Sequence, residues 1–112
     1  MNANPYLYLA LAIVCEVIGT SALKAANGFT RLVPSLVVAG GYAAAFFFLS
    51  LTLRTVPIGV AYAIWSGAGV LLLTLVAYVV YRQSLDAAAL IGIALIVAGV
   101  AIIHLYSKTH VR

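Results

Sequence analysis

Long stretches without a charged side chain divide this sequence and constrain its fold more than any other feature. Three stretches carry no Lys, Arg, Asp or Glu: residues 32–53, 55–81 and 87–107. A fourth, residues 1–23, contains only Glu16. A helix needs about 20 apolar residues to cross the hydrocarbon core of a bilayer, so each stretch fits one crossing and none fits two. The sequence therefore predicts four transmembrane segments.

The composition excludes a water-soluble globule, because 66% of the residues are hydrophobic and only 7% are charged, whereas about a quarter are charged in soluble domains. Within lipid the backbone must satisfy its own hydrogen bonds, which leaves helices or closed barrels. Residues 35–53 and 68–81 show no alternation of polar and apolar side chains, so barrel strands are not indicated. We expect an all-α membrane protein, a single domain over residues 1–112. Its helices are expected at about 5–25, 33–53, 57–81 and 86–106.

Local signals agree with these boundaries. Asn27-Gly28 is expected to end the first helix, because both residue types tolerate the left-handed conformation found after helix ends. Ser84 or Asp86 is expected to cap the fourth helix.

The cations predict no single orientation in the membrane. Three are expected on each side: Arg54, Lys108 and Arg112 on one, and Lys24, Arg31 and Arg82 on the other. The positive-inside bias that normally sets topology is therefore zero. One hypothesis is that the chain inserts both ways and that opposite copies pair as an antiparallel, dual-topology homodimer. The alternative is that the equal count is chance.

Six scattered cations form no basic stripe, so no nucleic-acid partner is expected.

Glu16 is the most informative residue. It lies eleven residues after Pro5 and eight before Lys24, which at about 1.5 Å per residue places it near the middle of the bilayer. Intramembrane carboxylates are costly and by default indicate functional sites. Two roles are open for Glu16. It is either permanently protonated and hydrogen-bonded to a neighbouring helix, or it is a site that alternately binds a proton and a cation.

Small and polar residues share the helix face of Glu16. Ala12 and Gly19 would leave space on either side of the carboxylate, and Thr20 could donate a hydrogen bond to it. Small residues also permit close packing of helices, which is the alternative explanation.

Aromatic side chains occur at the same expected depth. Tyr62, Trp65 and Ser66 fall on one stripe of the third helix, and Tyr42 and Phe46 on one stripe of the second. The polar tips of Tyr and Trp need partners there, and their ring faces attract cations. Ordinary core packing is the alternative for any single ring. Together with a carboxylate, the set is typical of a binding site for a lipophilic organic cation.

Glycines suggest two further roles. Gly67 and Gly69 lie halfway along the third helix, where they indicate either a hinge or dense packing. Gly92, Ile96 and Gly99 share one face of the fourth helix, which lacks a deep polar side chain, so we expect an association surface there. No set of metal ligands and no cofactor motif is expected, and no nucleophile–base pair indicates an enzyme.

Several motifs carry a resemblance to a known family. They are Pro5-Tyr6-Leu7-Tyr8, Glu16-Val17-Ile18-Gly19-Thr20, Gly28-Phe29-Thr30-Arg31 and Pro57-Ile58-Gly59-Val60-Ala61-Tyr62-Ala63-Ile64-Trp65-Ser66-Gly67-Ala68-Gly69. With Lys24, Pro34-Ser35, Tyr42, Asp86 and the Gly92/Gly99 pair, they span nearly the whole chain. The sequence resembles the small multidrug resistance family of bacterial proton-coupled exporters.

The resemblance implies an antiparallel homodimer in the bacterial inner membrane, whose two copies of Glu16 bind either protons or a cationic drug. By the same resemblance Tyr42, Tyr62 and Trp65 line the site, Tyr6 closes one end, and the fourth helix makes the main dimer contact. The family's guanidinium exporters typically have a Trp where this chain has Gly19, so the chain is similar to the branch that exports quaternary ammonium and polyaromatic cations. Guanidinium export and a small structural or regulatory membrane protein remain the alternatives.

Overall fold

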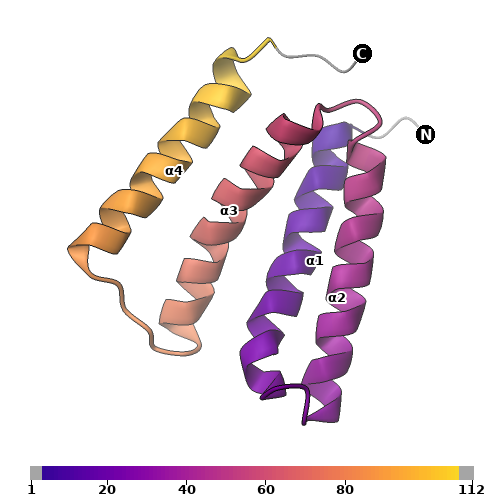
Figure 1. Cartoon of the computed structure of the whole chain (residues 1–112), viewed down its shortest axis with the longest axis vertical. Coiled ribbons are helices and arrows are strands. Elements are labelled where there is room, and N and C mark those ends of the chain that lie inside the picture. Colours follow the sequence, from indigo (N-terminus) through magenta and orange to yellow (C-terminus); the bar gives the residue numbers. More distant parts are fainter. Residues whose placement is uncertain (1–3, 109–112) are drawn as a thin grey trace. The chain divides into compact units, whose positions relative to one another are not determined.

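Four helices make up nearly all of the described chain. The computed structural model describes residues 4–108, so Arg112 of the cation count lies outside the described residues. The helices are α1 (Pro5–Ala26), α2 (Leu32–Thr52), α3 (Ile58–Val79) and α4 (Ala87–Tyr106) (Figure 1). Each is long and apolar enough to cross a membrane. The predicted all-α class and the four predicted spans are confirmed, with helix ends within two residues of those expected.

The helix ends follow from local chemistry. Asn4 caps α1, its side chain accepting a 2.8 Å hydrogen bond from the backbone N–H of Tyr6. Asn27 ends that helix in the left-handed conformation with φ 48°, as predicted. Asp86 caps α4 and accepts a 2.9 Å hydrogen bond from the N–H of Ala89. Of the two expected caps for the fourth helix, the structure therefore selects Asp86.

The chain divides into two compact units, one ending at Thr55 and one beginning at Val56. The first pairs α1 with α2 and the second pairs α3 with α4. Short loops join the helices within each unit, so each pair is antiparallel (Figure 1). That residues 1–112 act as a single four-helix domain stays a prediction.

A seven-residue pattern on α2 faces α1. The ring of Phe48 stacks on Tyr8 with centroids 6.4 Å apart, and the hydroxyl of Thr52 donates to the carbonyls of Phe48 (3.1 Å) and Pro5 (3.4 Å). The seam comprises Val38, Gly41, Ala45, Phe48 and Thr52. Its spacing of alternately three and four residues is typical of helices that cross at a small angle. This seam fixes the register of α1 against α2, and with it the residues around Glu16.

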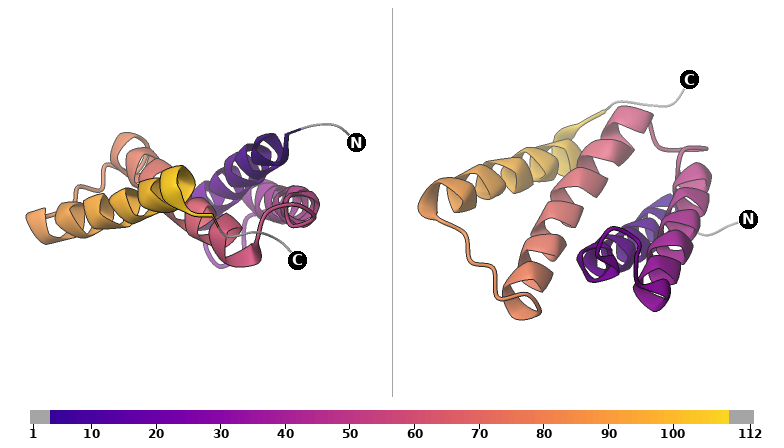
Figure 2. Two further views of the ribbon diagram at one scale, coloured as in Figure 1. Left: turned by 90° about the horizontal axis from the view of Figure 1, so that it is seen from above. Right: turned by 60° about the horizontal axis from the view of Figure 1, so that its bottom comes forward.

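The second unit is packed more loosely. Gly67 of α3 lies against Val100 of α4, where a Cβ at Gly67 would come 3.1 Å from the Cβ of Val100. Figure 2 shows that α3 and α4 lie farther apart at the loop that joins them than at their other ends. A cavity of about 350 Å³ lies between them, lined by Ile64, Gly67, Ala68, Leu71, Val97, Val100, Ala101 and His104. No residue of α4 is buried, so its apolar side chains are available for lipid or another chain.

Candidate functional site

Glu16 lies at the middle of α1, eleven residues after its first residue and ten before its last. At about 1.5 Å per residue the carboxylate is therefore some 15 Å from either end of the helix. The residue is half-buried. The structure thus places the one acidic side chain of the first unit at the middle of a membrane-length helix.

One oxygen of this carboxylate is bonded to the hydroxyl of Thr20, which is in turn bonded to the hydroxyl of Tyr42. Thr20, one helical turn after Glu16, donates a 2.6 Å hydrogen bond to Oε1. The Oη of Tyr42 on α2 lies 2.7 Å from the Oγ1 of Thr20. A hydroxyl has a single proton to donate, and that of Thr20 is directed to Glu16. Tyr42 is therefore the donor to Thr20, and the three groups form a hydroxyl chain that runs Tyr42 to Thr20 to Glu16 Oε1.

The other oxygen, Oε2, has no hydrogen-bond partner among the described residues. A buried polar atom without a partner is unusual and calls for a functional or structural reason. The two oxygens of Glu16 are thus in different states: Oε1 is held by the hydroxyl chain, and Oε2 is buried without a hydrogen-bond partner among the described residues.

The backbone of α1 makes room for Tyr42. A Cβ at Gly19 would come 3.2 Å from Cδ1 of the Tyr42 ring, tighter than most real contacts. The space expected beside Gly19 is therefore taken by this ring, and Gly19 acts by letting Tyr42 reach Thr20. Ala12, one turn before Glu16, is completely buried.

Gly41 is a residue that the sequence analysis missed. A Cβ at this position would lie 2.8 Å from the carbonyl oxygen of Cys15 and 3.0 Å from both Cα and N of Gly19. The α2 backbone therefore rests directly on the α1 backbone at this point. The available signal was the Gly40-Gly41 pair directly before Tyr42, since paired glycines within a helix lower its intrinsic stability and need a reason.

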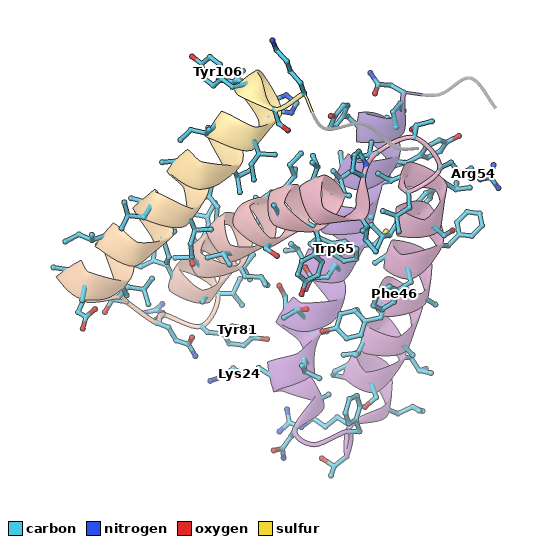
Figure 3. All side chains as sticks on the ribbon, turned by 45° about the horizontal axis from the view of Figure 1, so that its top comes forward. Lys24, Phe46, Arg54, Trp65, Tyr81 and Tyr106 are labelled. Atoms are coloured by element: carbon cyan, nitrogen blue, oxygen red, sulfur yellow. The ribbon has the colours of Figure 1, made fainter. Side chains whose placement is uncertain are left out.

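The remaining predicted lining residues lie elsewhere on the helices. Tyr62, Trp65 and Ser66 are on α3 in the second unit, where their spacing places them on one side of the helix, and Trp65 projects from it in Figure 3. Tyr6 is at the start of α1, and Phe46 projects from α2 one turn after Tyr42. The side chains of Tyr6, Phe46 and Tyr62 are 41%, 62% and 67% exposed. That these residues share one site with Glu16 stays a prediction.

The glycines of the second unit fall into two groups. Gly67 packs against Val100, and dense packing was the alternative explanation for this glycine. The helix α3 is continuous through Gly67 and Gly69. The hinge stays a prediction. A Cβ at Gly92 or Gly99 would meet nothing within 4 Å, and the side chain of Ile96 between them is 45% exposed. At these positions the proposed association surface is therefore open towards its surroundings, and its role in association stays a prediction.

The described residues contain no group of three or more His, Cys, Asp or Glu side chains that could hold a metal ion. The chemistry available around Glu16 is thus that of one carboxylate, two hydroxyls and apolar surroundings. Such a set can bind a proton or a cation, and it contains no activated nucleophile.

Comparison with known proteins gives a consistent result. The family model described as Small Multidrug Resistance protein matches residues 4–96. The multidrug transporter PA4990 of Pseudomonas aeruginosa is 57% identical over 103 residues, which cover 92% of this chain and 94% of the relative. The quaternary ammonium compound-resistance protein QacE of Escherichia coli is 54% identical with the same coverage. A putative ethidium bromide resistance protein of Escherichia coli is 55% identical over 93 residues, 83% of this chain and 81% of the relative.

Proposed function

Because the chain belongs to the small multidrug resistance family, we propose that it exports lipophilic organic cations in exchange for protons, with Glu16 as the group that binds both. It is a multi-pass membrane protein and a resistance transporter for drugs and quaternary ammonium compounds, and its family is one of transporters rather than enzymes. Beyond this, we propose three features: the coupling of transport to protons, the residues of the cation site, and the homodimer.

The observation that carries the proposal is the state of the Glu16 carboxylate. It lies at the middle of a membrane-length helix, and one of its oxygens has no hydrogen-bond partner in the described part of the chain. An uncompensated charge at this depth costs several kcal/mol, so Glu16 is stable there only with a proton or a cation bound. A residue under that constraint exchanges one for the other.

Coupling follows from the same constraint. With a proton bound the site is neutral, and with an organic cation bound its charge is balanced, so both forms can change the side of the membrane that they face. The empty, ionised form carries a bare charge and reorients slowly. Drug and proton therefore compete, and the inward proton gradient drives export. One elementary charge moved through 100 mV is worth about 2.3 kcal/mol, which supports a concentration ratio of roughly fifty.

The proposed assembly is an antiparallel homodimer in which two inverted copies each contribute Glu16. Support comes from the equal numbers of cations on the two sides and from α4, none of whose residues is buried. Tyr42, Tyr62, Trp65, Ser66 and Phe46 are proposed to line the cation site, and Tyr6 to close one end of it.

The test is proton release from the purified protein in weakly buffered detergent solution on addition of ethidium. We expect release from the unaltered protein and none from Glu16→Gln, which removes the titrating carboxylate and keeps its shape. Asp86→Asn is the matched control, because Asp86 is the only other acidic residue and Asn retains the ability to cap α4. Full release by Glu16→Gln would refute the role of this residue.

Guanidinium export is the second candidate for the substrate. The names of the relatives refer to quaternary ammonium compounds and ethidium, which favours bulky cations, and they give no support to a merely structural or regulatory protein. Proteoliposomes loaded with protein should exchange protons for cetyltrimethylammonium and not for guanidinium. The reverse preference would assign the chain to the guanidinium branch.

A further inference from the structure

We propose that Gly41 is a positioning residue of the cation site: by letting the α2 backbone rest on α1, it holds Tyr42 within hydrogen-bonding distance of Thr20 and thereby orients Glu16. The inference rests on the proposed function of Glu16, and it concerns a residue that does not itself touch the cation. It makes the affinity for organic cations depend on the spacing of two helix backbones.

The contact at Gly41 involves backbone atoms only. The atoms nearest to a Cβ at this position are the carbonyl oxygen of Cys15 at 2.8 Å and the Cα and N of Gly19 at 3.0 Å. Real Cβ atoms essentially never come that close, and backbone atoms within a helix cannot rotate out of the way as a side-chain tip can. Any residue other than glycine therefore forces the two helices apart.

The required separation is large compared with the tolerance of the hydroxyl chain. Ordinary contact for a Cβ begins at 3.4 Å, so an alanine at position 41 needs about 0.6 Å more space than the 2.8 Å available. The adjacent Tyr42 moves with the α2 backbone. Its hydroxyl lies 2.7 Å from Thr20, and hydrogen bonds between hydroxyls extend to about 3.0 Å. A shift of this size is sufficient to break the bond.

Breaking this bond acts on Glu16 through Thr20. Donated hydrogen bonds stabilise a carboxylate and fix its orientation. Without Tyr42 as donor, the hydroxyl of Thr20 is less firmly directed to Oε1, and Oε2 is no longer held in one position. The loss of one hydrogen bond between neutral groups corresponds to about three- to tenfold in affinity.

Gly40 provides a matched control within the same helix. A Cβ there would meet nothing within 4 Å, so Gly40→Ala changes the composition and the helix propensity as Gly41→Ala does without moving the helices. We expect Gly41→Ala to require about three- to tenfold more ethidium for half-maximal proton release, and Gly40→Ala to match the unaltered protein. Equal behaviour of the two variants would overturn the inference.

A double-mutant cycle separates positioning from general damage. Tyr42→Phe removes the hydroxyl and should weaken ethidium binding to a similar degree. If Gly41 acts through that hydroxyl, Gly41→Ala adds little in the Tyr42→Phe background, because residues of one network are not additive. Fully additive effects would assign Gly41 a purely structural role and overturn the inference.

If Gly41→Ala does not yield folded protein, Gly19→Ala tests the same relationship more gently. Its Cβ would press on the Tyr42 ring at 3.2 Å, so a displacement of a few tenths of an ångström is sufficient. Weaker ethidium binding supports the inference and unchanged binding overturns it. Failure of the proposed function can be told apart from failure of this inference. If Glu16 is not the coupling residue, Glu16→Gln still releases protons on addition of ethidium, and this result does not depend on the glycine variants.

Discussion

Thr20 lies one helical turn after Glu16 and donates a 2.6 Å hydrogen bond to its Oε1, while accepting one from Tyr42 of the neighbouring helix. A single threonine hydroxyl thus connects the acidic side chain of α1 to α2. Thr20 is the central member of the hydroxyl chain, so it is the position at which the chain can be interrupted most completely.

Replacing Thr20 by alanine should weaken ethidium binding about tenfold, because it removes a hydrogen bond to a carboxylate worth about 1.5 kcal/mol. Thr20→Ser keeps the hydroxyl and should bind ethidium within about twofold of the unaltered protein. Equilibrium titration of ethidium fluorescence on the purified proteins measures both. Equal weakening by the two variants would mean that the methyl group, and not the hydroxyl, matters.

Gly67→Ala should destabilise the second unit, because the added Cβ collides with Val100 of α4 and overpacking of this kind costs about 1–3 kcal/mol. The change is measurable as a lower midpoint of thermal unfolding. Gly59→Ala is the control, since a Cβ there meets nothing within 4 Å. Combining Gly67→Ala with Val100→Ala should recover most of the midpoint, because it removes the two Val100 methyl groups and leaves only a Cβ–Cβ contact of 3.1 Å.

The same pair of variants distinguishes packing from a hinge. If Gly67 serves only to admit Val100, the double variant regains transport together with stability. If Gly67 bends α3 during transport, the double variant recovers its midpoint of thermal unfolding but still fails to export ethidium from proteoliposomes.

The C-terminus should be found on both sides of the membrane, because the sequence predicts equal numbers of flanking cations on the two sides. A membrane-impermeant thiol reagent applied to intact cells measures this for a cysteine added after Arg112, with Cys15 replaced by alanine. Addition of two lysines to the loop between α1 and α2 should shift the distribution to one side. Labelling of a single orientation without that change would exclude dual topology.

Gly99→Leu should reduce homodimer formation and leave the fold of the chain intact. A Cβ at Gly99 contacts nothing within 4 Å in the described chain, so the added side chain starts into open space, and we expect it to interfere with a surface that another molecule covers. Cross-linking in membranes at several protein-to-lipid ratios measures dimer formation. Circular dichroism measures the helix content, and so tests the fold separately. Undiminished cross-linking would place the dimer contact elsewhere.

The sequence predicted the features that depend on one helix at a time. Three charge-free stretches and a fourth interrupted only by Glu16 predicted the four spans, and the spacing of four residues between Glu16 and Thr20 predicted a hydrogen bond that the structure contains. Both follow from helix geometry alone, without knowledge of which helix packs on which.

Contacts between helices were not predictable in the same way. Tyr42 was identified as an aromatic candidate, but its hydrogen bond to Thr20 depends on the register of α2 against α1, which is fixed by contacts such as Phe48 with Tyr8. The close approach at Gly41 and the seating of Val100 on Gly67 depend on distances of a few tenths of an ångström, and residue spacing carries no such information.

The unequal state of the two Glu16 oxygens bears on how chemically dissimilar compounds could share one carrier. A quaternary ammonium ion has no N–H group, so it cannot satisfy a receptor that demands a directed bond. Under the proposed function, Oε2, which is buried and has no hydrogen-bond partner among the described residues, would attract such an ion by charge rather than through a directed bond, while Oε1 is held by Thr20. If Glu16 is the cation-binding group that we propose, the binding of many bulky cations follows from this non-directional attraction, and the aromatic residues proposed to line the site need only accept the shape of the cation.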